Sequence, residues 1–320
     1  MGAARAPAAE TLADAERSTA GVLGAAGIQQ ALRDPLRTRA LASEVDLVAV
    51  DPALERSAVA ASDFRMLADV ADTVLIAGFT EIGAFRTQGD ALALKAKTHV
   101  RSVRTLDNAE LFEADGRYSG GAETVEAWSA DDGHRLLEAL ANLYRQQAGQ
   151  IVDGMFLLYP FPDRTPHGAS FMASAFGLAP LEPRNRGQLS GDPLVGNAFE
   201  WTRVSSRAPT LRWQSFPRAV DTRREPEPMS RVRDVRYDLV IARERGMAPA
   251  EIVYERQGLP TPVHRVETPL AADARFFWTV RARFELDGRE RVSEWSATHG
   301  QAANDELSVP SRACFRFRTP

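Results

Sequence analysis

Four residues near the C-terminal end have types and spacing that indicate a binding surface. Arg281 and Arg283 lie two positions apart in a stretch that alternates apolar and polar residues, and Arg291 and Trp295 lie on the next such stretch. Residues two apart on a strand share one face, so guanidinium groups can stack on an indole ring from the neighbouring strand. Two interpretations stay open. This stack of arginine side chains and Trp295 either stiffens the domain and covers Trp295, or it binds an anionic glycan or a partner protein.

The histidines and the cysteine do not predict a metal site. None of the histidines is spaced as a zinc-ligand pair, and a single cysteine excludes an intrachain disulfide. The histidines are His99, His134, His167, His264 and His299, and the cysteine is Cys314. We expect Cys314 to be a small core residue, because it lies in an alternating stretch. We therefore predict no metal and no cofactor.

No catalytic motif is recognisable either. His134 follows Asp131 and Asp132, which would suit acid–base chemistry, but carboxylates are also typical of a helix start, and we favour that interpretation. The segment Gly21–Gly27 resembles a dinucleotide loop only superficially, since no strand precedes it. A triad assembled from distant Ser, His and Asp residues is not excluded by sequence. We therefore expect a protein without enzymatic activity. The alternative is an enzyme, such as a hydrolase, whose site lies between two domains.

Charge and hydropathy exclude two further classes. The net charge is −4, with 15 basic and 22 acidic side chains in residues 1–150, which is unlike a nucleic-acid-binding protein. No run of 18 apolar residues is present, so we predict no membrane-spanning helix. The first residues lack the apolar core of a signal peptide.

The N-terminal half has mixed helical and strand periodicities. Apolar spacing predicts helices and alternation predicts strands. The first expected element is a helix at 28–41, which Pro35 interrupts unless it begins a new helical turn. The others are a strand at 45–50, a helix at 63–70 capped by Ser62, a central strand at 73–79, a hairpin of 91–104 with 110–117, a loop at 115–121 and a helix from Ser129 to Met155.

The C-terminal half is expected to be all β. Residues 159–208 are rich in Gly and Pro and are predicted to be a linker that wraps between domains. Six or seven short strands follow, with a loop at 221–230, and the clearest is Ala274–Phe284. Its Phe276, Trp278 and Val280 share one face with Ala282 and Phe284, so this strand is expected to build the core of an immunoglobulin-like sandwich.

The C-terminal stretches Leu211–Trp213, Tyr237–Ile241, Phe276–Ala282 and Glu294–Ser296 resemble a fibronectin type III-like module over about residues 209–320. The strand of Phe276 resembles the sixth strand of that fold. The family often has Tyr at this place, and Phe276 lacks its hydroxyl group. The resemblance implies a structural framework and no enzymatic activity.

Several N-terminal stretches resemble another family, the bacterial envelope lipoproteins of the curli-assembly and TolB N-terminal type. They are Ala71–Leu75, Thr80–Gly83, Val100–Arg104, Ala127–Asp132 and Ile151–Asp153. The resemblance covers about residues 28–158. It implies an α/β domain in the periplasm, tethered at the outer membrane by a lipidated N-terminal Cys. This sequence has no Cys near its start, so we expect that a tether was either removed with a leader or never existed.

We therefore expect four segments: a flexible segment at 1–27, an α/β domain at 28–158, a linker at 159–208 and a fibronectin type III-like β-sandwich at 209–320. The expected function is a non-catalytic role in assembly, scaffolding or binding in the bacterial cell envelope. Its expected partners are an envelope protein or an anionic glycan, without nucleic acid. A purely structural subunit of an oligomer is a further alternative, for which a large apolar patch would be the sign.

Overall fold

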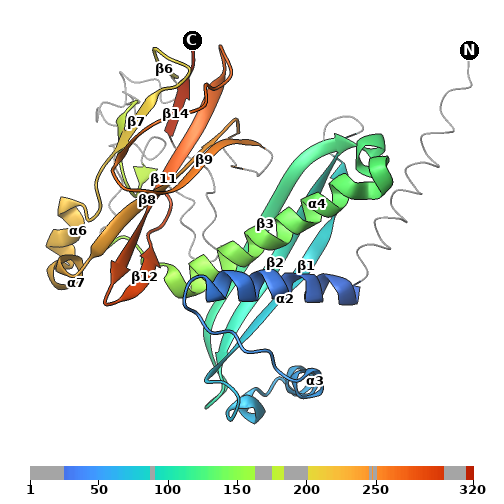
Figure 1. Cartoon of the computed structure of the whole chain (residues 1–320). Helices are drawn as coiled ribbons and strands as arrows, with labels where there is room; N and C mark the ends of the chain where they lie inside the picture. Colours follow the sequence, from blue (N-terminus) through green and yellow to red (C-terminus); the bar gives the residue numbers. More distant parts are fainter. Residues whose placement is uncertain are drawn as a thin grey trace, which may run out of the picture. The chain divides into compact units, whose positions relative to one another are not determined.

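The structure is a computed structural model that describes residues 25–86, 91–162, 175–183, 201–244, 247, 251–298 and 315–320. The chain divides into two compact units, with Phe156 at the end of the first and Leu157 at the start of the second (Figure 1). The expected flexible segment 1–27 lies outside the described residues up to position 24, and residues 25–27 belong to a helix. Each unit is described below by itself.

The first unit contains an antiparallel sheet of three long strands in the order β1-β2-β3. They are β1 (Thr73–Arg86), β2 (Ala91–Arg104) and β3 (Ala109–Thr124). The strand expected at 91–104 forms with these bounds, and its alternate side chains from Leu94 to Ser102 are buried on one face. The expected loop at 115–121 is wrong, because β3 stays paired with β2 as far as Thr124.

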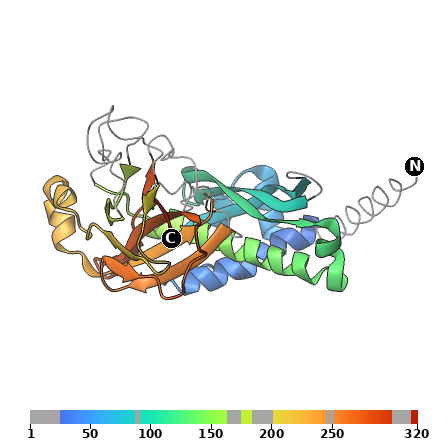
Figure 2. The same cartoon turned by 90° about the horizontal axis from the view of Figure 1, so that it is seen from above.

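Two helices cover one face of this sheet (Figure 2). They are α2 (Ala25–Leu41), which runs through Pro35 without a break, and α4 (Val125–Val152). The core between helices and sheet contains Leu32, Leu36, Val100 and Ile151. Helix α4 begins at Val125 instead of Ser129, because the Thr124 hydroxyl group accepts a hydrogen bond from the Ala127 amide at 3.2 Å. A π-helical turn, Asp153–Leu157, continues α4.

The segment before β1 differs from expectation. A helix, α3 (Pro52–Ala61), begins after Asp51, whose carboxylate accepts hydrogen bonds from the amides of Ala53 and Leu54. Ser62 ends this helix in the left-handed region instead of starting one, and only a short 3-10 turn, η1 (Arg65–Leu67), follows. The expected strand at 45–50 does not form. Val45, Leu47 and Val50 still pack against the cores, but none of the described strands pairs with this segment.

The second unit contains two main sheets. The smaller has the order β10-β7-β5, and the larger has the order β6-β14-β11-β8-β9 with β12 also paired to β11. The strands are β5 (Pro180–Glu182), β6 (Thr202–Arg203), β7 (Thr210–Trp213), β8 (Arg233–Ala242), β9 (Ile252–Leu259), β10 (Val263–Arg265), β11 (Arg275–Leu286), β12 (Arg289–Val292) and β14 (Phe315–Arg318). A two-stranded ladder joins β4 (Ala175–Phe176) to β13 (Ala297–Thr298).

One hydrophobic core joins both sheets of the second unit. Leu211 and Trp213 come from the smaller sheet, and Tyr237 and Trp278 come from the larger. The five residues expected on the inner face of β11 are all buried in this core, which confirms that prediction. The second unit is therefore rich in β-structure, whereas the first mixes helices with a sheet.

Two short helices occupy the expected loop at 221–230. They are α6 (Ala219–Arg224) and α7 (Pro226–Ser230). Arg218 holds the start of α6 by donating two hydrogen bonds, at 2.8 and 2.6 Å, to the carboxylate of Asp221. Both side chains are almost fully buried, and the Arg218 guanidinium also lies over the ring of Phe161 at 4.4 Å. Burial of this ion pair explains why a charged sequence forms structure here.

The expected linker contributes strands to the second unit. Within residues 159–208, β5 pairs with β7 and β6 pairs with β14. The Tyr159 amide donates a hydrogen bond to the Val292 carbonyl at 2.8 Å. Because these pairings are with residues distant in the sequence, the Gly and Pro content of the segment did not indicate them. Among the described residues, none of the helices has the length and apolar content needed to cross a membrane.

Candidate functional site

The candidate site lies on the outer face of the larger sheet in the second unit. Arg281 and Arg283 alternate with the core residues of β11, so their side chains stand on the opposite face. On the neighbouring strand β8, Asp238 pairs directly with Arg281 in the ladder. Cross-strand neighbours share a face, and this register therefore places a carboxylate beside two guanidinium groups.

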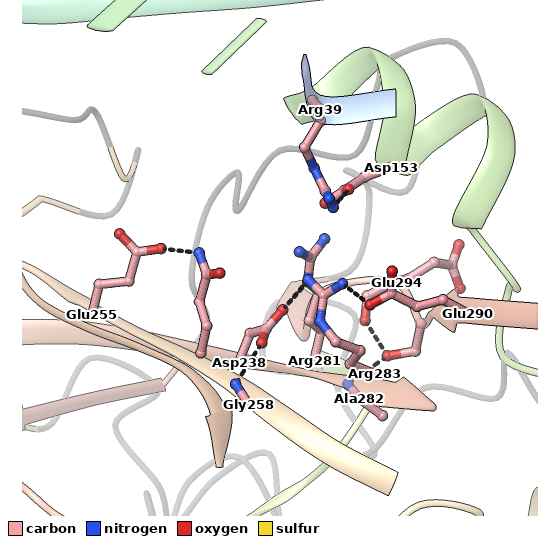
Figure 3. A network of polar contacts seen from close by, with 12 residues as sticks. Arg39, Asp153, Asp238, Glu255, Gly258, Arg281, Ala282, Arg283, Glu290 and Glu294 are labelled. Carbon is pink, nitrogen blue, oxygen red and sulfur yellow. Dashed lines mark hydrogen bonds and ion pairs between the residues drawn. The ribbon is translucent and has the colours of Figure 1, made fainter. Parts of the chain in front are cut away.

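The Asp238 carboxylate is the centre of a hydrogen-bonded cluster (Figure 3). Its Oδ2 accepts from Arg281 Nε at 2.9 Å and from Arg283 Nη2 at 3.0 Å, and its Oδ1 accepts from the Gly258 amide at 3.1 Å. The exposed fractions of the side chains are 2% for Asp238, 6% for Arg281 and 17% for Arg283. Arg283 also forms an ion pair with Glu290 on β12. This is a closed cluster, because its charged groups face one another.

The electrostatics of the cluster keep Asp238 ionised. Burial acts to raise the pKa of Asp238, but the nearby charges of Arg281 and Arg283 and their hydrogen bonds outweigh it, so the pKa lies below its usual value. Burial likewise acts to lower the pKa of Arg283, and Asp238 and Glu290 outweigh it, so that pKa lies above its usual value. A carboxylate held in its ionised form by two cations is a poor general acid or base near neutral pH.

Trp295 joins the cluster through Arg281. The Arg281 guanidinium carbon lies 4.7 Å from the centre of the Trp295 ring, within the range of a cation–π contact. The segment that carries Trp295 is fastened to β11 by two hydrogen bonds, from the Thr279 hydroxyl group to the Ser296 carbonyl at 2.7 Å and from the Ala282 amide to the Ser293 hydroxyl group at 2.9 Å. The structure thus brings Arg281, Arg283 and Trp295 to one face.

Arg291 has a different place. In the ladder between β11 and β12, Arg291 pairs with Phe284, which is a core residue. The register therefore assigns Arg291 to the face of Phe284, whereas Glu290 lies on the face of Arg283. Of the four residues expected to form one surface, Arg291 is the one that the register separates from the others.

The described histidines have local partners. His99 lies 3.0 Å from the carboxylate of Asp115, and His134 lies 3.4 Å from Glu138. His264 Nε2 lies 2.5 Å from the Tyr254 hydroxyl group. His167, His299 and Cys314 lie outside the described residues, as do the side chains of Asp131 and Asp132. Within the described residues, no group of three His, Cys, Asp or Glu side chains is arranged to hold a metal ion.

Asp238 organises the cluster, and it was not predicted from the sequence. Asp238 lies between Tyr237 and Leu239 on an alternating strand, where a charged residue is ordinarily read as solvent-facing. One signal could have found it: two arginines in alternation on one strand favour a carboxylate at the facing position of the next strand.

Comparisons with known proteins add little to this geometry. No protein-family model matches the chain, and no curated protein matches it. Lipoprotein GNA1162 from Neisseria meningitidis is a structural neighbour with 19% identity and a TM-score of 0.19, and the match covers 28% of this chain and only 59% of that protein. The hypothetical protein CT253 from Chlamydia trachomatis matches with 12% identity and a TM-score of 0.29, over 39% of this chain and 79% of that one. At these TM-scores neither similarity carries an argument.

Proposed function

We propose that the protein is a non-catalytic component of the bacterial cell envelope with an assembly, scaffold or binding role, and that its second unit is a fibronectin type III-like module. The envelope role rests on the resemblance of several N-terminal stretches to envelope lipoproteins. The observation that carries the assignment of the second unit is its strand order. Taken along the chain, the seven main strands are β5, β7, β8, β9, β10, β11 and β14. The first, second and fifth form one sheet, and the third, fourth, sixth and seventh lie together in the other.

This distribution supports an immunoglobulin-like sandwich. In that architecture the first, second and fifth strands share one sheet and the third, sixth and seventh share the other, around a common core. Here β11 is the sixth strand, and β9 lies beside β8 as an addition to the second sheet. The step from this architecture to a binding or scaffold role is an analogy with other sandwich modules, because a fold alone does not specify a function.

The arginine cluster supports the non-catalytic part of the proposal. Arg281 and Arg283 direct their guanidinium groups to Asp238, and Arg283 also pairs with Glu290. We assign to Arg281, Arg283 and Trp295 the role of stiffening the module. The competing role, in which these residues and Arg291 bind an anionic glycan or a partner protein, requires the ion pairs to open and so to leave Asp238 buried without its cations.

The envelope part of the proposal is tested by locating the natural gene product. The full protein, tagged at its C-terminus and expressed in its own bacterium, is separated into cytoplasmic, periplasmic and membrane fractions beside marker enzymes for each. We expect the tag in the periplasmic or membrane fraction. Recovery with the cytoplasmic marker alone would contradict an envelope role while leaving the assignment of the sandwich intact.

A further inference from the structure

A second arginine-rich surface lies on the same sheet, at a place that the sequence did not indicate. Residues Arg203, Arg318 and Arg275 come from three adjacent strands, β6, β14 and β11 (Figure 1). Arg318 is the direct ladder partner of both Arg203 and Arg275, so the three side chains form one row across the sheet. Their faces agree, because the alternate residue Phe317 lies in the core. We call this row the arginine row.

The arginine row carries uncompensated positive charge. Arg318 pairs with Asp273 at 2.5 Å. Within the described part of the chain, neither Arg203 nor Arg275 lies in a salt bridge, and both are exposed. Like charges directly opposite one another on neighbouring strands destabilise a sheet. A chain of net charge −4 has no general excess of cations, so this local excess is a particular feature of the row.

An aromatic side chain, Trp201, contacts one member of the arginine row. The Trp201 ring centre lies 5.3 Å from the Arg275 guanidinium carbon and 5.7 Å from that of Arg316, which neighbours the row on β14. The rings of Trp201 and Phe277 also pack in a T-shaped arrangement, with centroids 5.0 Å apart. Stacking on an aromatic face orients a guanidinium group and reduces the conformational freedom that it loses on binding. Arg275 is therefore the member of the row that is preorganised for an anion.

We propose that the arginine row binds an acidic polysaccharide through its carboxylate or sulfate groups. Guanidinium groups recognise such planar or tetrahedral oxyanions with paired hydrogen bonds. Adjacent strands are about 4.8 Å apart, so the row presents a line of regularly spaced cations that suits charges repeated along a polymer. Small molecules bind mainly in concave sites, whereas this row stands on the outer face of a sheet.

Other anionic partners fit the row less well. A nucleic-acid site offers aromatic faces on which bases stack, but Trp201 is in contact with Arg275, Arg316 and Phe277. Membrane surfaces are bound by protruding apolar side chains together with cations, and Trp201 is half-buried against the sheet. An acidic peptide can also be bound by clustered arginines, and the poly-L-glutamate arm of the test below distinguishes it from a polysaccharide. This site goes beyond the proposed envelope role, and its test does not depend on where the protein resides.

The test measures binding of the full chain to fluorescently labelled polygalacturonate and heparin by fluorescence anisotropy. The double variant Arg203→Gln/Arg275→Gln is expected to weaken binding by about tenfold or more, since two charge-assisted hydrogen-bonding groups are lost. The matched control is Arg223→Gln/Arg265→Gln, which removes two exposed arginines from α6 and β10 and leaves the row intact. Its affinity is expected to equal that of the unaltered protein. Binding is also expected to weaken as salt is added.

A third variant separates charge from geometry. Arg203→Lys/Arg275→Lys keeps both charges and removes the planar guanidinium groups. We therefore expect its affinity to lie between that of the unaltered protein and that of the glutamine variant. If circular dichroism shows that the glutamine variant does not fold, the lysine variant is used for the test. An affinity of the lysine variant equal to that of the unaltered protein would then overturn the proposal. Equal loss in the control variant would overturn it as well. Absence of binding, or equally tight binding of poly-L-glutamate, single-stranded DNA or phosphatidylglycerol vesicles, would overturn the assignment to a polysaccharide.

Discussion

Arg281 donates a hydrogen bond from Nε to Oδ2 of Asp238 at 2.9 Å, at a place where both side chains are almost completely buried. The Asp238 carboxylate also accepts from Arg283, so one anion serves two cations. Removal of one of these buried charged groups destabilises the fold, because it leaves the others charged, desolvated and without their partner. The pair is thus the electrostatic centre of the larger sheet.

Replacement of Asp238 tests this dependence. We expect Asp238→Ala to lower the free energy of unfolding by about 3–5 kcal/mol, because Arg281 and Arg283 would then face each other without their carboxylate. Urea denaturation followed by circular dichroism measures the change. The matched control is Glu267→Ala, which removes an exposed partner of Arg256 and is expected to have little effect. Similar losses in both variants would contradict a special role for the buried pair.

The same pair predicts a dependence on acid pH. The folded pKa of Asp238 lies below its ordinary value of 3.8, so its contribution to stability is present above that pH and is lost as pH falls through the lower folded value. We expect the difference in unfolding free energy between the unaltered protein and Asp238→Asn to be constant near neutral pH. It should shrink under acid conditions. A difference that stays constant at every acid pH would argue against the depressed pKa.

Tyr159 predicts a change at alkaline pH. Burial, together with its hydrogen bond of 2.5 Å to Glu225, raises the pKa of Tyr159 to about 12. Stability from the neutral phenol is therefore present below its ordinary pKa of 10.0 and is lost as pH rises through about 12. Tyrosine ionisation is followed by ultraviolet absorbance in the unaltered protein and in Tyr159→Phe. The difference between the two titration curves should have its midpoint at a pH of about 12. Glu225→Gln should lower this midpoint, whereas Glu227→Gln should leave it unchanged.

A buried polar contact in the first unit allows a double-mutant cycle. Thr98 on β2 and Gln147 on α4 are fully buried, and the Thr98 hydroxyl group donates a hydrogen bond to Gln147 Oε1. We expect Thr98→Val to cost about 1–3 kcal/mol, because the amide oxygen loses its donor. Thr98→Val/Gln147→Leu should cost less than the sum of the single changes, since both partners are removed. Thr80→Val on the exposed part of β1 is the control.

Local patterns were enough to predict the well-formed strands. Alternation in residues 91–104 and 274–284 places one set of side chains in the core, whichever strands lie beside them. The apolar run at 73–79 was expected to be a central strand, whereas β1 lies at an edge of its sheet. Both of its faces are nevertheless packed, against α4 on one side and against the α3 region on the other. An apolar run therefore reports covered faces and says nothing about lateral neighbours.

Where local patterns failed, a distant partner was the reason. Residues 45–50 alternate as a strand does, yet strand formation also requires a neighbour that supplies hydrogen bonds. Short strands within 159–208 exist only through pairing with β7 and β14. None of these partners lies within the window over which a sequence period can be read.

The sequence by itself determined which residues of the strands at 91–104 and 274–284 face the core, since that follows from a period of two and from the cost of burying polar groups. It also determined the mixed character of the first unit and the β-rich character of the second. Only the tertiary structure decided that Asp238 meets Arg281, and that Arg203, Arg318 and Arg275 stand in one row. Both arrangements depend on the register between strands far apart in the chain, and register is settled by the packing of the whole sheet.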